Sequence, residues 1–300
     1  MLWIGIIPIL LTHAPSCLAS PENPKEAEPT LTRMVQEANA PQPLGERLPS
    51  SDWEDFRLTA RHVGSRFAHP GGRDLMLFAG IVAGSAWLQH NKLELATDAQ
   101  ELRTPERDRF AGTVRPLGEA AVPVAALSTW LIGKMTGQER MRQAGLILTE
   151  SATFTVAATE LLQFVFSEQR PADGGDLRYF RPGGHGVSGH TSIVASLSVP
   201  LDRMFFRLKP GEPGGVRFGK ILGKTLVYAA PIATGWSRVN DDKHYAWNVV
   251  AGLGVGFMMG DFVMSAHEPA DDAAPSARPW RIVPITGDRG GVGVGVAFTP

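Results

Sequence analysis

The segment Arg181–Thr191, with the sequence RPGGHGVSGHT, carries side chains that could do chemistry at a helix start. Ser188, Gly189 and His190 directly precede an apolar run that predicts a helix. The free backbone N–H groups and the positive dipole end of a helix N-terminus bind anions. Ser188 can cap the helix or donate to the anion, and Gly189 lets a ligand approach the backbone. We therefore expect an anion site here, with His190 beside it as a proton donor near neutral pH.

The same tripeptide is also typical of an ordinary capped helix start, so the residues on either side decide its meaning. Two further groups of polar residues flank it: Gln163, Arg170 and Pro171 upstream, and Ser237, Arg238, His244 and Asn248 downstream. An arginine can bind two phosphate oxygens at once, which lysine does less well. A neutral histidine is a competent nucleophile if an acceptor holds its other ring nitrogen. The three groups together favour chemistry on a phosphate.

The order and spacing of these groups resemble the type 2 phosphatidic acid phosphatase superfamily, which shares its fold with the vanadium haloperoxidases. The family pattern is K-x6-R-P, P-S-G-H and S-R-x5-H-x3-D, and the resemblance extends from about Arg140 to Asp261. It implies that His244 is the nucleophile and forms a phospho-histidine, and that His190 protonates the departing alkoxide. It also implies a metal-independent, cofactor-free site in which phosphate contacts Gln163, Arg170, Ser188, Gly189 and Arg238.

Three positions depart from the family pattern: Gln163 replaces the lysine, Val187 the proline and Asn248 the aspartate. Gln163 can hydrogen-bond a phosphate but supplies no positive charge. Asn248 lies four residues after His244 on one helix face, so we expect its carbonyl to accept from the imidazole. It carries no charge to stabilise an imidazolium, as the aspartate of a catalytic triad does. The departures therefore leave two alternatives: a slow or specialised phosphatase, or a catalytically dead relative.

Several alternatives stay open. Asp241 or Asp242, in the loop before His244, could orient that histidine instead of Asn248. A pseudo-phosphatase would bind phosphorylated ligands or proteins without hydrolysing them. A vanadate-dependent haloperoxidase is disfavoured by the missing lysine. A zinc site formed by His185, His190 and His244 would match no known ligand spacing, so we expect no metal.

The apolar runs predict an all-α antiparallel bundle of about six helices, followed by a short strand-like tail that alternates glycine with valine. A charged connector is expected at 92–115, and a short docking helix near Trp53. Pro123, Pro200 and Pro231 should kink or shorten their helices. The expected helices are Asp74–His90, Glu119–Met135, Arg140–Ser167, Ser188–Phe206, Gly219–Trp236 and His244–Ala266. In such a bundle the ends that carry the three polar groups meet on one side.

We divide the chain into a signal-peptide-like segment (1–20), a disordered linker (21–52), a helical phosphatase-like domain (53–266), and a linker with the strand-like tail (267–300). A buried N-terminal segment is the alternative to the signal peptide. The single cysteine, Cys17, excludes an internal disulfide. The net charge of −1 gives no indication of a nucleic-acid partner.

Charged residues bear on the membrane question in two ways. The connectors opposite the candidate site are basic, so the positive-inside rule puts the site on the periplasmic face of a membrane. Glu150 and Glu160 interrupt the longest helix, and most charge-free runs are shorter than the ~18 residues of a typical span. We expect an exported, membrane-associated protein that acts on a phosphorylated small molecule or a lipid-linked phosphate. A soluble periplasmic protein is the alternative.

Overall fold

The structure is a computed structural model that describes residues 51–268, 280–286 and 292–298. The predicted signal peptide lies outside the described residues, as do nearly all of the linker at 21–52 and most of the linker that begins at 267.

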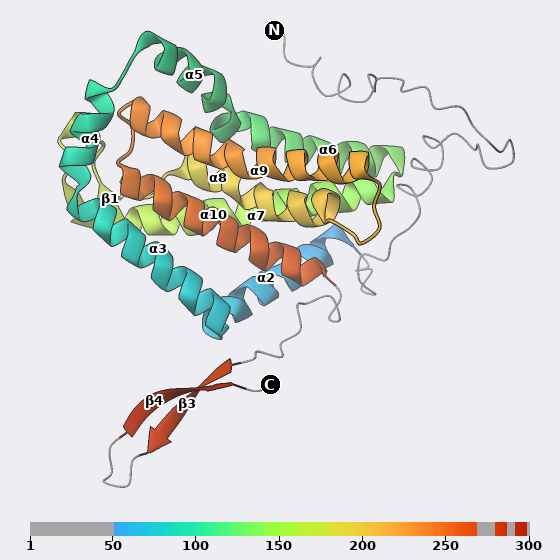
Figure 1. The fold of residues 1–300 in the computed structure, drawn as a ribbon. Coiled ribbons are helices and arrows are strands. Elements are labelled where there is room, and N and C mark those ends of the chain that lie inside the picture. The colour runs from blue at the N-terminus through green and yellow to red at the C-terminus, as the bar shows by residue number, and fades with distance from the viewer. Residues whose placement is uncertain (1–50, 269–279, 287–291, 299–300) are drawn as a thin grey trace, which may run out of the picture. The chain divides into compact units, whose positions relative to one another are not determined.

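The described residues form an all-α bundle (Figure 1), which confirms the predicted fold class. Its α-helices are α2 (Asp52–Ala68), α3 (Gly72–His90), α4 (Lys92–Glu101), α5 (Pro105–Pro116), α6 (Val122–Thr136), α7 (Glu139–Val165), α8 (Gly189–Leu201), α9 (Gly214–Asn240) and α10 (Ala246–His267). A π-helical turn, η2 (Leu117–Ala121), joins α5 to α6, and a second, η4 (Asp202–Phe206), extends α8 just after Pro200. A single 3₁₀ turn, η3 (Pro171–Asp173), follows Arg170.

The charged connector expected at 92–115 is wrong, because this stretch forms α4 and α5. Thr104 caps α5, since its hydroxyl accepts a hydrogen bond from the Arg107 N–H at 3.3 Å. Pro105 follows at the first helical position, where its missing N–H costs nothing. Thr104 and Pro105 are a helix-start signal in the sequence, and the prediction missed it because it relied on the high charge of the stretch. Figure 1 shows α4 and α5 at the end of the bundle where α9 ends and α10 begins.

Short strands complete the described residues. β1 (Phe166–Glu168) pairs antiparallel with β2 (Leu177–Tyr179) directly after α7, where a continuing helix was expected. The predicted strand-like tail is confirmed as an antiparallel pair, β3 (Trp280–Thr286) and β4 (Val292–Phe298).

Glycines of α10 set how closely that helix approaches α8. A Cβ atom added at Gly252, Gly256 or Gly260 would lie 2.7, 2.3 and 2.3 Å from carbonyl oxygens of α8 and its N-cap residue. The three glycines are four residues apart and therefore share one helix face. The two backbones can thus pack against each other, which holds the start of α8 beside the start of α10.

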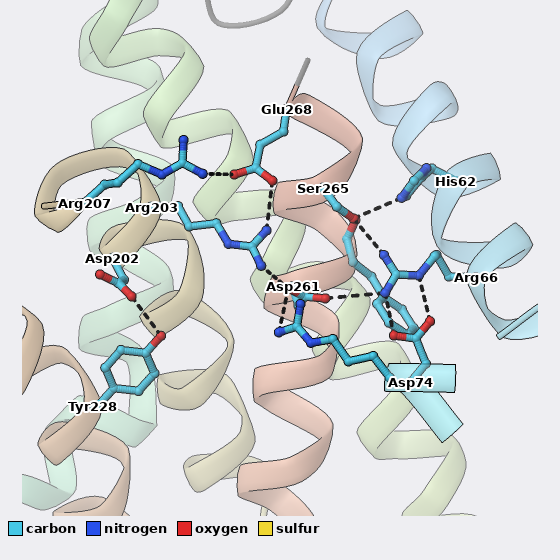
Figure 2. A network of polar contacts seen from close by, with 12 residues as sticks. His62, Arg66, Asp74, Asp202, Arg203, Arg207, Tyr228, Asp261, Ser265 and Glu268 are labelled. Carbon is cyan, nitrogen blue, oxygen red and sulfur yellow. Dashed lines mark hydrogen bonds and ion pairs between the residues drawn. The ribbon is translucent and has the colours of Figure 1, made fainter. Parts of the chain in front are cut away.

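An ion-pair network ties four elements together near the C-terminal end of α10 (Figure 2). Arg66 of α2 binds Asp74 of α3, with an Nη2–Oδ1 distance of 2.6 Å, and also reaches Asp261 of α10. Arg203 of η4 binds Asp261 as well, and binds Glu268 at 3.0 Å. The network fixes α2 and α3 to the bundle through charged groups that are mostly buried.

Large apolar side chains are exposed on three helices: Leu75, Met76, Phe78 and Trp87 on α3; Val124, Leu131 and Met135 on α6; Phe218, Leu222 and Leu226 on α9. Within the described residues, two helical stretches have the length and composition to cross a membrane: Pro105–Thr136 and Ala246–His267. Only 17% of the most apolar window of the first is buried, against 61% for the second. The second is thus a core helix of the bundle, whereas the first has an apolar surface free to contact lipid.

Candidate active site

Hydrogen bonds join the three polar groups of the sequence at one end of the bundle. The Ser188 N–H, at the start of α8, donates to the Asn248 carbonyl of α10 at 3.0 Å. The side chain of Gln163, near the end of α7, donates to the Val187 carbonyl at 2.7 Å. The N–H of His244 donates to the Arg238 carbonyl at 3.3 Å. Segments almost eighty residues apart in sequence therefore surround one region, as the bundle topology predicts.

Two glycines hold the loop before α8 against the end of α7 and β1. A Cβ atom at Gly186 would lie 1.8 Å from the Phe166 carbonyl oxygen, and one at Gly184 would lie 2.4 Å from the Ser167 Cα. No side chain fits at either position, so the loop can take this path only with glycine. The His185 N–H then donates to the Glu168 carbonyl at 2.8 Å, which places His185 next to the site.

Arg170 and Arg238 lie near His190, whose pKa both charges lower. In the described part of the chain, the Nε of each is buried and has no hydrogen-bond partner. Arg238 is 7% exposed, and its nearest carboxylate, that of Asp241, is 3.9 Å from Nη1. Burial is the main cause that lowers the pKa of Arg238, and Asp241 opposes it. Buried guanidinium N–H groups without partners cost free energy and gain most from an incoming anion.

His244 is buried in the loop between α9 and α10. Burial is the largest cause that lowers the pKa of His244 to about 3. The charges of Arg238, His185 and His190 contribute to this shift, and a backbone hydrogen bond with His185 opposes it. The ring centroids of His185 and His244 are 6.4 Å apart. The Nδ1 atom of His244 is buried without a hydrogen-bond partner among the described residues. Its ring is therefore neutral near pH 7, the form in which an imidazole is nucleophilic.

His190 stands in the first turn of α8, close to both arginines. Burial lowers the pKa of His190 most; Arg238 and Arg170 also lower it, and Glu119 raises it. The element that covers His190 is η2, because a Cβ atom at Gly118 would lie 2.7 Å from the His190 Cβ. Sequence reasoning missed η2 as part of the site, since its glycine carries no chemistry of its own.

Asn248 does not contact the His244 ring through its carbonyl, contrary to the expectation. Its Oδ1 accepts from the Tyr245 N–H at 2.8 Å, and its Nδ2 donates to Glu168 Oε2 and to the Gly186 carbonyl, each at 2.9 Å. Because these partners are one donor and two acceptors, they determine which amide atom is oxygen and which is nitrogen. Asn248 therefore holds the loop before α8 to the start of α10.

Glu168 explains why residue 248 is an asparagine. Glu168 is 1% exposed, and its Oε1 accepts from Lys92 of α4 at 2.7 Å. Lys92 also donates to the Gly175 carbonyl at 2.6 Å. An aspartate at position 248 would put a second carboxylate against that of Glu168 and would leave the Gly186 carbonyl without its donor. Sequence reasoning missed this pairing because Lys92 and Glu168 are distant in sequence.

One other expectation about polar residues is corrected. Ser188 does not cap α8: its hydroxyl pairs with that of Thr191 at 2.9 Å. Asp241 is bound by Arg115 of α5, with an Nη2–Oδ2 distance of 2.7 Å. A Cβ atom at Gly189 would meet nothing closer than Gln163 Nε2 at 3.7 Å, so the space beside this residue is open and its expected role toward a ligand stays a prediction.

A comparison with known protein families gives one match. Residues 144–271 match the model of the PAP2 superfamily. This match, over less than half of the chain, confirms the resemblance to that superfamily found in the sequence. No curated protein matches the chain.

Two solved structures are similar to the chain. One is LpxE of Aquifex aeolicus, at 18% identity and a TM-score of 0.39, covering 58% of this chain and 94% of that one. The other is the first transmembrane PAP2 type phosphatidylglycerolphosphate phosphatase from Bacillus subtilis. It matches at 15% identity and a TM-score of 0.45, covering 68% of this chain and 98% of that one.

Proposed function

We propose that this protein is a phosphatase that hydrolyses a phosphate monoester or diphosphate, without a metal, through a phospho-histidine on His244. One observation carries the proposal: Arg170 Nε, Arg238 Nε and His244 Nδ1 are all buried without hydrogen-bond partners in the described chain. Two cationic donors and a neutral imidazole in one region suit a phosphate better than any other common ligand. The match to the PAP2 superfamily supports the same reaction class.

The reaction proceeds in two displacements. Arg170, Arg238 and the backbone N–H groups at the start of α8 bind the non-bridging oxygens and neutralise their charge. The neutral His244 attacks phosphorus, the P–O bond to the leaving group breaks, and His190 gives its proton to the departing alkoxide. Water then attacks the phospho-histidine and gives a proton to His190, which releases inorganic phosphate and restores both histidines.

Substrate binding favours the protonated form of His190. In the free protein the two arginines help to lower the pKa of His190, so the ring tends to be neutral. A bound phosphate brings negative charge next to the same ring and raises its pKa. His190 is thus protonated when the substrate arrives and can act as the acid.

A lipid phosphate fits the surface of the molecule. The exposed apolar side chains of α3, α6 and α9 favour contact with a bilayer, where such a substrate resides. The basic connectors at the other end favour a cytoplasmic position for that end and hence a periplasmic position for the site. We therefore assign the protein to the membrane, with its site facing the periplasm.

A second candidate is a pseudo-phosphatase that binds phosphorylated ligands. The observation in its favour is the position of Gln163, whose amide donates to the Val187 carbonyl instead of offering a charge to phosphate. A pseudo-phosphatase of this kind would bind phosphate through the same residues but would not hydrolyse the ester. The same lack of charge weighs against a vanadate-dependent haloperoxidase.

Phosphate release by the purified protein tests the proposal. We expect hydrolysis of p-nitrophenyl phosphate and of phosphatidic acid in detergent with EDTA present. We expect the activity to be lost in His244→Ala and retained in the matched control His69→Ala, whose histidine is exposed at the end of α2. Equal rates for the wild type and His244→Ala would refute hydrolysis through His244. If both were inactive yet bound phosphate, the pseudo-phosphatase would replace the enzyme.

A further inference from the structure

Three helices bring two carboxylates and an imidazole together far from the candidate active site. They are Asp55 of α2, Glu150 of α7 and His267, the last residue of α10. One side-chain ligand atom from each lies within 4.8 Å of those from the other two. Glu150 is thirteen residues before Gln163 on α7, or about 20 Å along the helix at 1.5 Å per residue. The cluster therefore has no part in the phosphate chemistry.

The contacts within the cluster centre on His267. Its Nε2 is 2.8 Å from Glu150 Oε2 and 3.2 Å from the Thr59 hydroxyl. Its Nδ1 is 3.7 Å from Asp55 Oδ1. The side chains are 12% exposed for His267, 1% for Glu150 and 17% for Asp55. The imidazole of His267 therefore lies between two largely buried carboxylates, with one near each ring nitrogen.

The protein balances the charges of this cluster only in part: a protonated His267 pairs with one carboxylate charge, and Arg142 acts on Asp55 from beyond ion-pair distance. Among the described residues, neither carboxylate forms an ion pair with a lysine or an arginine. The Oε1 atom of Glu150 is buried and has no hydrogen-bond partner, although Glu150 is almost completely enclosed. Buried carboxylates in proteins are paired with cations or coordinate metals, because an uncompensated buried charge costs several kcal/mol. The second oxygen of Glu150 is therefore available to a further cation.

We propose that Asp55, Glu150 and His267 bind a divalent transition-metal ion of the zinc type. One imidazole nitrogen and two carboxylate oxygens are ligands that Zn²⁺ accepts at ~2.0–2.2 Å. Tetrahedral ligands at those distances are ~3.3–3.5 Å apart, so His267 and Glu150 need to separate by roughly half an ångström. Asp55, which now lies nearest to Nδ1, must also move toward the ring nitrogen that binds the metal. The metal replaces the proton that His267 and Glu150 now share, and water or the Thr59 hydroxyl completes the coordination.

The proposed metal joins α2 to the bundle. Asp55, Thr59 and His62 follow one another at helical spacing on the face of α2 directed at the end of α10. His62 donates to or accepts from Ser265 at 3.0 Å, the contact drawn in Figure 2 beside the Arg66 ion pairs. Because α2, α7 and α10 each contribute one ligand, the metal stabilises their packing rather than a local loop.

Metal analysis of the full-length protein, purified without a histidine tag, tests the site. The protein is treated with EDTA, desalted, incubated with Zn²⁺ and passed through a gel-filtration column. We expect about one Zn²⁺ per chain by mass spectrometry, and a Tm that rises and saturates with Zn²⁺ concentration. Glu150→Gln keeps the shape of the side chain and a hydrogen bond to His267, and should weaken Zn²⁺ binding at least tenfold.

Matched variants separate this site from other zinc ligands. Glu160→Gln removes an exposed carboxylate from the same helix and should leave both readouts unchanged. His244→Ala disrupts the histidines at the other end and should still bind Zn²⁺. Equal binding by the wild type and Glu150→Gln, or loss of binding only in His244→Ala, would overturn the proposal. If Glu150→Gln does not fold in EDTA, Asp55→Asn takes its place with the same expected result.

Discussion

Asn248→Asp is the most informative single substitution, because it restores the residue of the family pattern at a position where this structure disfavours it. The amide of Asn248 donates to Glu168 and to the Gly186 carbonyl, both buried, at 2.9 Å. An aspartate keeps the acceptor that serves the Tyr245 N–H but loses both donors. It also brings a carboxylate to about hydrogen-bonding distance of the Glu168 carboxylate.

The expected loss of stability follows from those two contacts. A buried acceptor that loses its donor costs ~1–3 kcal/mol, and more when it is charged. Two such losses, with like-charge repulsion added, give a decrease of roughly 3–5 kcal/mol in the free energy of unfolding. At ~2–4 °C per kcal/mol for a domain of this size, the Tm should fall by roughly 6–20 °C. Thermal unfolding followed by circular dichroism, in matched detergent, measures the change.

A double variant tests the cause of that loss. Glu168→Gln combined with Asn248→Asp exchanges donor and acceptor, so that an amide again faces a carboxylate. The double variant should be more stable than the sum of the two single variants predicts, by at least ~1 kcal/mol. An unchanged Tm for Asn248→Asp would refute the reasoning. A higher kcat without a loss of stability would also refute it, because that result would indicate that residue 248 orients His244.

Three further predictions concern the site itself. Arg170→Ala and Arg238→Ala should each lower kcat/KM by about 10²–10³, because each removes a charged donor to the transition state. Steady-state assays measure this effect, and a decrease of less than threefold would exclude that role. The kcat/KM should decline as pH rises through values below 6.5, because His190 must be protonated in the transition state and its pKa in the free protein is lowered. His244, with a pKa of about 3, should impose no loss of activity between pH 7 and 5, and pH–rate profiles of the wild type and His190→Ala measure both effects. Gly118→Ala should lower both Tm and activity, because its Cβ would lie 2.7 Å from His190; a wild-type Tm and kcat in this variant would show that η2 yields without displacing His190.

Local signals were sufficient for most helices and for the residues of the candidate site. The apolar run after Gly72 predicted α3 within two residues of its observed start, and the run after Ser188 predicted α8. The order of the polar groups, together with antiparallel packing, predicted that Gln163, His190 and His244 lie at one end. Charge misled the prediction at 92–115, where Thr104 and Pro105 mark a helix start that composition alone hides.

The partners of the polar side chains could not be predicted in the same way. Spacing along a helix tells which residues can meet, and it placed Asn248 within reach of His244. It does not tell which of several partners a buried amide chooses, because that depends on charges brought in by other elements. Glu168 and Lys92, far away in sequence, decided the role of Asn248.

The sequence by itself therefore determined the helical bundle, the resemblance to the PAP2 superfamily and the identities of the phosphate-binding candidates, since these depend on periodicity and fixed spacing. Only the tertiary structure decided that Asp241 binds Arg115, that Asn248 serves the backbone, and that Asp55, Glu150 and His267 share one buried cluster. The physical reason is that a buried polar group forms hydrogen bonds or ion pairs with the groups that tertiary packing places next to it. Packing of helices from distant parts of the chain leaves no local trace in the sequence.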